Sequence, residues 1–308
     1  MNDLCIIAIN IDGVSDKLDD IECINFLSKY DIVFLFEAKC IQRVSVPGFE
    51  SIRSSLITGE DLRGGTIVLL KHNLWSCVYD VHRYKDQVWF SLSCVAEFRF
   101  GAVYITPSDS PYFSPQSFAF VRNECKMYAR CILAGDLNAR MPLLQDMFGD
   151  IGRQIAYEEN VDDKSNSHTK EVSLMFKECD IVPLNHMIYG DKKFEGNLTF
   201  RKGKKWVSQV DWAMCDIESV KAVASLKIIQ SLCFRTDHAA LVLSLKCDMT
   251  IESIYIRAWD LGKSILPKPP ENPSFACLIL TFPSSKLPCV TPQNSGLCPM
   301  ISTLRHIS

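Results

Sequence analysis

Short apolar runs that end abruptly in acidic or amide residues recur over the first 247 residues, and this feature constrains the fold most. In ILAGDLN, for example, an apolar run is followed by Asp136 and Asn138. Such runs are rich in β-branched and aromatic residues and are bounded by Gly, Asp, Asn or Pro, which is typical of β-strands. The expected strands are Leu4–Asn10, Ile32–Phe36, Thr66–Leu70, Val88–Ser93, Phe98–Ile105, Cys131–Ala134, Asn197–Phe200, Val207–Cys215 and Ala239–Leu245.

Helical periodicity is found in fewer segments. Ile21, Ile24 and Leu27 recur at helical spacing, for example, and predict one amphipathic helix. Many strands and few helices predict the α+β fold class. We expect a four-layer α/β sandwich, in which two mainly antiparallel β-sheets pack face to face with helices outside. The expected helices are Asp19–Lys29, Ser117–Ala129 and Lys170–Cys179.

The character of the sequence changes near residue 248. Eight of the 14 prolines lie in the last 61 residues, and no sustained periodicity accompanies them. Because proline removes backbone donors and breaks helices, this segment is not expected to build a packed core of its own. We therefore expect one domain over residues 1–247 and a proline-rich, poorly ordered tail over 248–308.

Composition limits the partners and the compartment. The net charge is −3, so no overall field attracts nucleic acid or membranes, and a polyanion would have to bind a local patch. The first residues lack a basic signal-peptide start, and no segment reaches the roughly 18 apolar residues of a membrane span. The 14 cysteines form no CxxC pair, so neither a zinc site nor a disulfide framework is indicated. We expect an intracellular protein, cytoplasmic or nuclear, without a membrane partner.

Polar residues in six of these segments form the candidate site. A single acidic residue after a strand is ordinary turn chemistry, but here the arrangement recurs. If the strand ends meet at one edge, their oxygen ligands suit a hard cation such as Mg²⁺, and a lone imidazole suits acid–base work or charge stabilisation. This combination fits hydrolysis of a phosphate ester. The candidate residues are Asn10, Asp12, Glu37, Tyr104, Asp136, Asn138, Asp211, Asp237 and His238.

The ordered motifs N-x-D-G, F-E-A-K, Y-I-T-P, G-D-L-N, V-D-W and T-D-H resemble those of the endonuclease/exonuclease/phosphatase superfamily, over roughly residues 4–247. Within it, GNLTFRKGKKWVSQVDWAM is most similar to the apurinic-type endonuclease of LINE-type (non-LTR) retrotransposons. In those proteins a T-F strand and an S-x-[IVL]-D strand flank a basic loop. The resemblance implies a metal-dependent phosphodiester hydrolase, and most specifically a DNA endonuclease that nicks one strand and leaves a 3′-hydroxyl.

The resemblance also implies a metal site for Mg²⁺, with Mn²⁺ as an alternative. Glu37 would bind the ion, helped by Asn10 and Asp12. Asp237 would lie in the shell around the metal and His238.

Catalytic roles follow from the same resemblance. Asp136 would orient or deprotonate the attacking water, and Asn138 would hold the scissile phosphate. His238 would stabilise the transition state, with Asp211 fixing the imidazole tautomer and supporting its positive charge. Tyr104 would contact the phosphate.

The segment FRKGKKW carries four cations, Arg201, Lys202, Lys204 and Lys205. It is either a solvated hairpin turn or a loop that reaches DNA, since phosphate contacts supply most non-specific affinity. The DNA-facing set also includes Thr199 and Thr236, which would support the site.

The remaining histidines match no motif and are expected at the surface or in core packing. They are His72, His82, His168, His186 and His306.

Two other functions remain open at this point. The same fold could cleave abasic sites or a soluble phosphate ester, as an AP endonuclease or a phosphatase. Alternatively, the chain could be a catalytically idle remnant that acts as a binding module. The sequence holds no Y-x-D-D polymerase signature, so an isolated endonuclease or a truncated element is expected, with DNA as substrate and no obligate protein partner.

Overall fold

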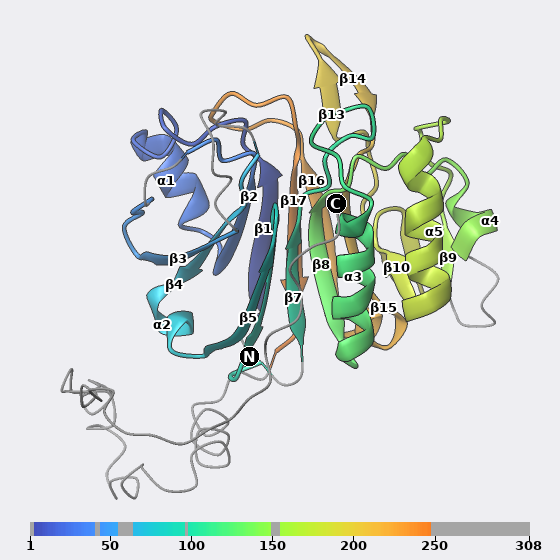
Figure 1. The fold of residues 1–308 in the computed structure, drawn as a ribbon, viewed down its shortest axis with the longest axis horizontal. Coiled ribbons are helices and arrows are strands. Elements are labelled where there is room, and N and C mark those ends of the chain that lie inside the picture. Colours follow the sequence, from blue (N-terminus) through green and yellow to red (C-terminus); the bar gives the residue numbers. More distant parts are fainter. Residues whose placement is uncertain (1–2, 41–43, 55–63, 96–97, 149–154, 248–308) are drawn as a thin grey trace, which may run out of the picture. The chain divides into compact units, whose positions relative to one another are not determined.

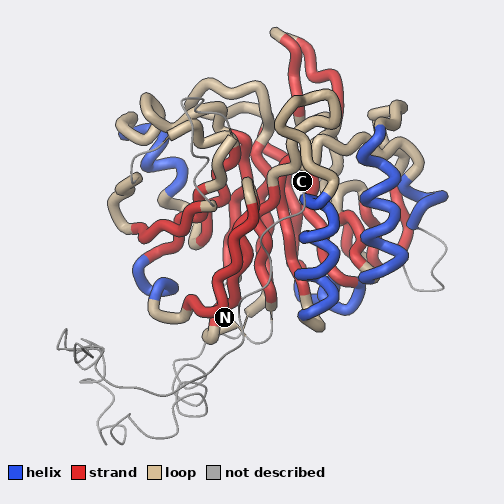
Figure 2. The backbone as a smooth tube through the Cα atoms, in the orientation of Figure 1, coloured by secondary structure: helices blue, strands red, loops and turns tan. Residues whose placement is uncertain are grey.

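The computed structural model of the protein describes residues 3–40, 44–54, 64–95, 98–148 and 155–247. The expected tail at 248–308 lies outside these residues. The described chain is built from two mixed sheets and few helices (Figures 1 and 2), which confirms the predicted α+β sandwich. No helix in the described ranges is long and apolar enough to cross a membrane.

The first six-stranded sheet is built around β1. Its sequence LCIIAIN is a nearly continuous apolar run, as expected for a strand covered on both faces. β1 pairs in parallel with β2 and antiparallel with β17, so the carboxyl ends of β1 and β2 lie beside the start of β17. The order of the sheet is β16 (Val223–Ile229), β17 (Ala240–Leu245), β1 (Leu4–Asn10), β2 (Ile32–Phe36), β4 (Ile67–Lys71) and β3 (Phe49–Arg53).

The second six-stranded sheet has β8 and β7 at its centre. These two strands are parallel, whereas β15 runs antiparallel to β8. The end of β8 therefore lies beside the beginning of β15. The order of the sheet is β10 (Ile181–Pro183), β15 (Asp211–Asp216), β8 (Cys131–Asp136), β7 (Arg99–Val103), β6 (Gln87–Leu92) and β5 (Val78–Tyr84).

The main core lies between the two sheets. Phe34 of β2 meets Phe90 of β6 edge to face, with ring centroids 6.3 Å apart, and β1 and β2 lie close to β8. A second apolar cluster lies on the other face of the first sheet, and it joins Cys23 and Leu27 of α1 with Ile7 and Val33 of the sheet. Figure 1 shows α3 and α5 outside the second sheet. The described layers are therefore helix, sheet, sheet, helix.

Helices are few and mostly short. The longest, α5, begins with a capping box in which the Asn166 side chain and Thr169 satisfy each other's backbone N–H groups. The helices are α1 (Ile21–Leu27), α2 (His72–Trp75), α3 (Gln116–Met127), α4 (Leu144–Phe148) and α5 (Ser167–Cys179), with a 3₁₀ helix η1 (Ile217–Ala222).

Two smaller sheets complete the described structure. One has three very short strands that sequence periodicity did not indicate. The other is the hairpin β13–β14, in which Gly203 takes the positive φ of +64° that a two-residue hairpin turn requires. The strands are β9 (Ile155–Tyr157), β11 (Met187–Tyr189) and β12 (Lys192–Lys193) in the first, and β13 (Phe200–Lys202) and β14 (Lys205–Ser208) in the second.

Two expected strands depart most from the structure, whereas five others shift at an end by one or two residues. Of the segment 197–200, only Phe200 is in a strand, and the run 207–215 is divided between β14 and β15. The cause is Thr199, whose hydroxyl oxygen accepts hydrogen bonds from the backbone N–H groups of Val210 and Asp211, both at 3.0 Å. Hydrogen bonds to the Thr199 side chain thus replace backbone pairing between the end of β14 and the start of β15.

Candidate active site

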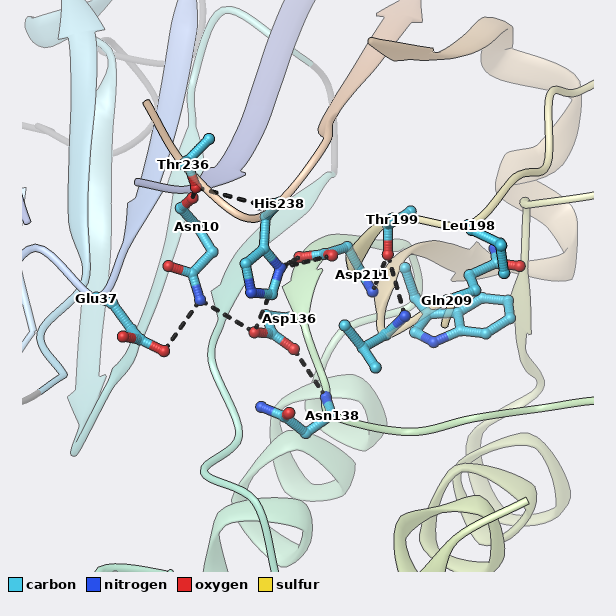
Figure 3. Close-up of polar contacts among 12 residues, drawn as sticks. Asn10, Glu37, Asp136, Asn138, Leu198, Thr199, Gln209, Asp211, Thr236 and His238 are labelled. Carbon is cyan, nitrogen blue, oxygen red and sulfur yellow. Dashed lines mark hydrogen bonds and ion pairs between the residues drawn. The ribbon is translucent and has the colours of Figure 1, made fainter. Parts of the chain in front are cut away.

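Figure 3 shows that the strand ends bring several of the predicted polar residues to one rim, namely Asn10, Glu37, Asp136, Asn138, Asp211 and His238. Asn10 ends β1, Glu37 directly follows β2, and Asp136 ends β8. Asp211 begins β15 and pairs in register with Asp136. His238 lies just before β17, which runs antiparallel to β1. The topology therefore brings together residues that are far apart in the sequence.

Asn10 connects the two halves of this rim. Its amide Nδ2 donates to Glu37 Oε1 and to Asp136 Oδ2, each at 3.1 Å. Glu37 Oε1 also accepts from the Tyr104 hydroxyl at 2.9 Å. Burial opposes ionisation of Glu37, but hydrogen bonds from Asn10, Lys39 and Tyr104 outweigh it and hold the pKa of Glu37 below its ordinary value. Glu37 is therefore a charged, oriented carboxylate.

His238 and two aspartates form the other half. His238 Nδ1 lies 2.9 Å from Asp211 Oδ2 and 3.9 Å from Asp136 Oδ2. Burial alone would lower the pKa of His238, but the charge and hydrogen bond of Asp211, with the charge of Asp136, raise it to about 9. Burial and the charge of Asp211 raise the pKa of Asp136 to about 7. The site thus pairs an imidazolium with a carboxylate that titrates near neutrality.

Buried threonines hold these groups in place. Thr199, which is fully buried, fixes the start of β15 through the two bonds already described. Thr236 donates from its hydroxyl to the Asn10 carbonyl at 2.6 Å and accepts from the His238 backbone N–H at 3.2 Å. Both side chains contact the site's own backbone and are 0% and 4% exposed.

Three site residues have an unusual backbone. Asp12, Glu37 and Asn138 take φ values of +51°, +49° and +48°, although none is glycine. Such conformations are sparsely populated and cluster at functional sites. At Asn138 the turn lets the backbone N–H reach Asp136 Oδ1 at 3.0 Å, while Nδ2 donates to the Ile105 carbonyl at 2.9 Å. These two bonds fix the backbone and the side chain of Asn138 beside Asp136.

Lys39 was quoted in the F-E-A-K motif but given no role by the sequence. Its ammonium lies 3.0 Å from Glu37 Oε2 and also pairs with Asp12. An ammonium group therefore joins the two carboxylates expected to bind a metal ion. Asp12 itself is more exposed than the others, with 54% of its side chain accessible.

Asp237 is placed differently from His238. Its carboxylate lies 3.7 Å from Arg201 Nε and its side chain is 57% exposed. Arg201 also donates from Nη2 to the Thr236 carbonyl at 2.7 Å. The contacts of Asp237 are thus with the base of the basic hairpin.

The basic hairpin is tied to the site at its base and exposed at its tip. Phe200 forms an antiparallel bridge with His238, and the two rings are 5.1 Å apart. Lys202, Lys204 and Lys205 are all exposed. Figure 1 shows β13 and β14 projecting beyond the ends of the neighbouring strands. Three cations are therefore presented to solvent beside the rim.

The chemistry of the rim fits a hard cation. With every group ionised, the carboxylates of Asp12, Glu37, Asp136 and Asp211 outnumber the cations of Lys39 and His238 by two. Glu37 and Asn10 offer oxygen donors of the kind that Mg²⁺ prefers. Ligand atoms of Asp136, Asp211 and His238 also lie within 4.8 Å of one another, but His238 Nδ1 is already bonded to Asp211. The Glu37 end therefore suits a metal ion better.

Compared by sequence, the chain matches no family model and no curated protein. Its structure is similar to an AP endonuclease, LMAP from Leishmania major, with a TM-score of 0.60 at 13% identity, covering 79% of this chain and 88% of that one. NExo, a 3′ phosphatase from Neisseria bound to a product DNA hairpin, gives 0.58 at 16% identity, covering 79% and 99%. The endonuclease domain of TRAS1, a telomere-specific non-LTR retrotransposon, gives 0.54 at 18% identity, covering 79% and 99%.

The chain has the endonuclease/exonuclease/phosphatase fold. The resemblance that the six motifs carried is thereby confirmed for the architecture. At these identities the likeness concerns the fold, so the activity must follow from the side chains at the rim.

Proposed function

We propose that the protein is a Mg²⁺-dependent phosphodiester hydrolase, and within that class a retrotransposon-derived DNA endonuclease that nicks one strand and leaves a 3′-hydroxyl. One observation carries the proposal. The Asp211–His238 pair lies beside Asp136, and Asn10 links Asp136 to Glu37 at 3.1 Å on each side. Asp136 as base, His238 as imidazolium and Glu37 as metal ligand would thus act from one rim.

Asp136 is suited to activate the attacking water. Hydrogen bonds from Asn10 and from the Asn138 backbone orient its two oxygens. Its pKa of about 7 makes it a better proton acceptor than an ordinary aspartate, while a large fraction is still ionised at neutral pH. The backbone N–H of Asn138 donates to this carboxylate, and the Asn138 side chain would position the scissile phosphate beside it.

His238 is suited to stabilise charge on the phosphate. Because Nδ1–H donates to Asp211, Nε2–H is left to donate to a phosphate oxygen. The raised pKa of His238 keeps it protonated at neutral pH, so the charge is in place before the reaction begins. A divalent cation held by Glu37 and Asn10 would add neutralisation of the phosphate and of the leaving oxygen. Tyr104, whose hydroxyl donates to Glu37, would contact the phosphate on the Glu37 side of the rim.

A local basic patch supports DNA as the substrate. The net charge of the chain is −3, so the exposed cations of Lys202, Lys204 and Lys205 matter as a cluster beside the rim. Arg201 would anchor this cluster through its bond to the Thr236 carbonyl. We assign Thr199 and Thr236 a supporting role, since they are buried against the site's backbone.

Nicking of supercoiled plasmid tests the proposal. The purified chain should convert supercoiled DNA to the open circular form with Mg²⁺ or Mn²⁺ and should fail with EDTA. The nick should carry a 3′-hydroxyl, which DNA polymerase can extend without further treatment. Intact supercoiled DNA in the presence of Mg²⁺ would refute the nicking role.

A second candidate is cleavage at abasic sites or removal of a 3′ phosphate, because the similar structures include an AP endonuclease and a 3′ phosphatase. Rates on an abasic duplex, an intact duplex, a 3′-phosphorylated duplex and a soluble phosphate ester separate these activities. A chain that binds duplex DNA but turns over none of the four substrates would be the catalytically idle alternative.

A further inference from the structure

The loop that follows β8 is held by side chains at five consecutive carbonyls. Residues 137–141 follow Asp136 and leave the strand ladder, so their carbonyls, three of which accept buried bonds, need other donors. The donors are His168 Nδ1 to Leu137 at 3.0 Å, Asn166 Nδ2 to Asn138 at 2.6 Å, Trp212 Nε1 to Ala139 at 2.8 Å, Thr169 Oγ1 to Arg140 at 2.6 Å and Asn160 Nδ2 to Met141 at 2.9 Å.

Three of these five donors come from one place, the first turn of α5. Asn166 is the N-cap of this helix, and His168 and Thr169 follow in its first turn. The capping box fixes Asn166 and Thr169 relative to each other. A rigid helix end therefore supports the loop that contains the positive-φ residue Asn138.

Leu137 is the point where this support matters most. Its backbone N–H donates to the Val210 carbonyl at 3.1 Å, and its carbonyl accepts from His168 Nδ1. Leu137 separates Asp136 from Asn138, so these two bonds fix the peptide groups that orient both side chains. Rotation of either peptide would move the carboxylate and the amide relative to each other.

His168 is buried among aromatic rings and uses its Nδ1 for the bond to the Leu137 carbonyl. It is 2% exposed, and its ring lies 5.1 Å from each of the Phe113 and Phe118 rings. Within the described part of the chain, its Nε2 has no hydrogen-bond partner, and burial lowers the pKa of His168. Burying a ring nitrogen without a partner among phenyl groups costs free energy of folding. An apolar side chain would avoid this cost, so the histidine is explained by the donor that Nδ1 supplies.

We propose that His168 is a positioning residue for the hydrolysis, acting through its Nδ1–H bond to the Leu137 carbonyl to fix the loop that begins directly after Asp136 and carries Asn138. The inference rests on the proposed function. It assigns a role to a histidine that matched no sequence motif and that lies outside the strand-end cluster.

Two substitutions separate the hydrogen bond from packing. His168→Phe keeps an aromatic ring between Phe113 and Phe118 but removes the donor. His168→Asn places an amide donor near the position of Nδ1 and removes ring volume. If the bond positions the loop, His168→Phe should lower kcat by roughly 10- to 100-fold with KM for DNA within about twofold, since misplacement of reacting groups by an ångström costs rates of this order. His168→Asn should keep kcat within about threefold.

Hydrogen exchange gives a readout that needs no activity. In His168→Phe, peptides covering 136–141 should exchange faster than in wild type, while peptides from β1 and β17 should not change; His168→Asn should resemble wild type. Should wild type fail to nick DNA, the proposed function falls, and this exchange pattern still decides the positioning role. Val172→Ala removes buried packing one turn further along the same helix but no hydrogen bond to residues 137–141, and it should leave kcat unchanged.

The contradicting results are equally specific. If His168→Phe keeps the wild-type kcat and exchange, or if His168→Asn loses as much as His168→Phe, the bond does not position the loop. If His168→Phe does not fold, His168→Leu against His168→Asn makes the same comparison in the same two measurements, because the two side chains have similar shapes and only asparagine can donate. Equal behaviour of that pair would overturn the proposal.

Discussion

At the scale of single residues, Asp211 determines the pH range over which His238 is protonated. The raised pKa of His238 depends on Asp211, so kcat/KM should fall above about pH 9, where the imidazolium loses its proton. In Asp211→Asn the charge that raises the pKa is gone while burial remains, so the basic limb should move to lower pH. The profile of log kcat/KM against pH from 5 to 10 measures this shift.

The acidic limb of the same profile reports Asp136. Its pKa is raised to about 7, and a base must be ionised to act, so activity should fall as pH drops through about 7. A cation bound nearby favours the charged carboxylate and would move this acidic limb to lower pH.

For the basic limb, the same position in Asp211→Asn as in wild type would contradict the coupling between Asp211 and His238.

At the scale of elements, Gly135 controls how closely β8 approaches β7. A Cβ atom at this position would lie 1.8 Å from the Val103 carbonyl oxygen and 3.0 Å from the Phe36 ring. The first neighbour is backbone and cannot move aside, so Gly135→Ala should lower the free energy of unfolding by about 3 kcal/mol. Urea denaturation measures this. Gly203→Ala, in open space at positive φ, should cost about 1 kcal/mol, and equal losses for the two would contradict the packing argument.

The hairpin β13–β14 makes a different prediction, about binding. Replacement of Lys202, Lys204 and Lys205 by Ala should weaken DNA binding at low salt and reduce the slope of log K against log salt by about 3, one unit for each lost phosphate contact. The kcat at saturating DNA should be unchanged, because none of the three contacts the rim. Lys221→Ala, in η1 at the far end of β15 from Asp211, serves as the control. An unaltered salt slope in the triple variant would show that the hairpin is only a solvated turn.

At the scale of the whole molecule, metal binding should be coupled to stability. A ligand that binds only the folded state stabilises it, by about 2.7 kcal/mol at 100 times its Kd. Mg²⁺ should therefore raise the Tm of wild type, and EDTA should reverse the rise. Glu37→Gln should lose most of the effect because the charged ligand is gone. The same Tm rise in Glu37→Gln would place the ion elsewhere.

The polar residues at the strand ends were predictable from the sequence because an apolar run bounded by a polar residue is a local pattern. Asn10, Glu37, Asp136 and Asp211 each follow or begin an apolar run, and sheet topology alone then brings them together. Contacts formed only by the folded chain were not predictable in the same way. The role of His168 depends on a carbonyl 31 residues away, and the bridge made by Lys39 follows a segment in which Glu37 and Lys39 both take positive φ. The NSHT sequence at the start of α5 was the one available signal, since it is a helix-capping pattern.

Plasmid nicking by wild type, Asp136→Ala and His238→Ala, measured side by side with Mg²⁺ at pH 8, tests the central claim most directly. If one rim holds a base, an imidazolium and a metal ion, wild type should nick, and each substitution should reduce the rate to background while the circular dichroism spectrum stays native. A rate near that of wild type in either variant would mean that the chemistry takes place somewhere else.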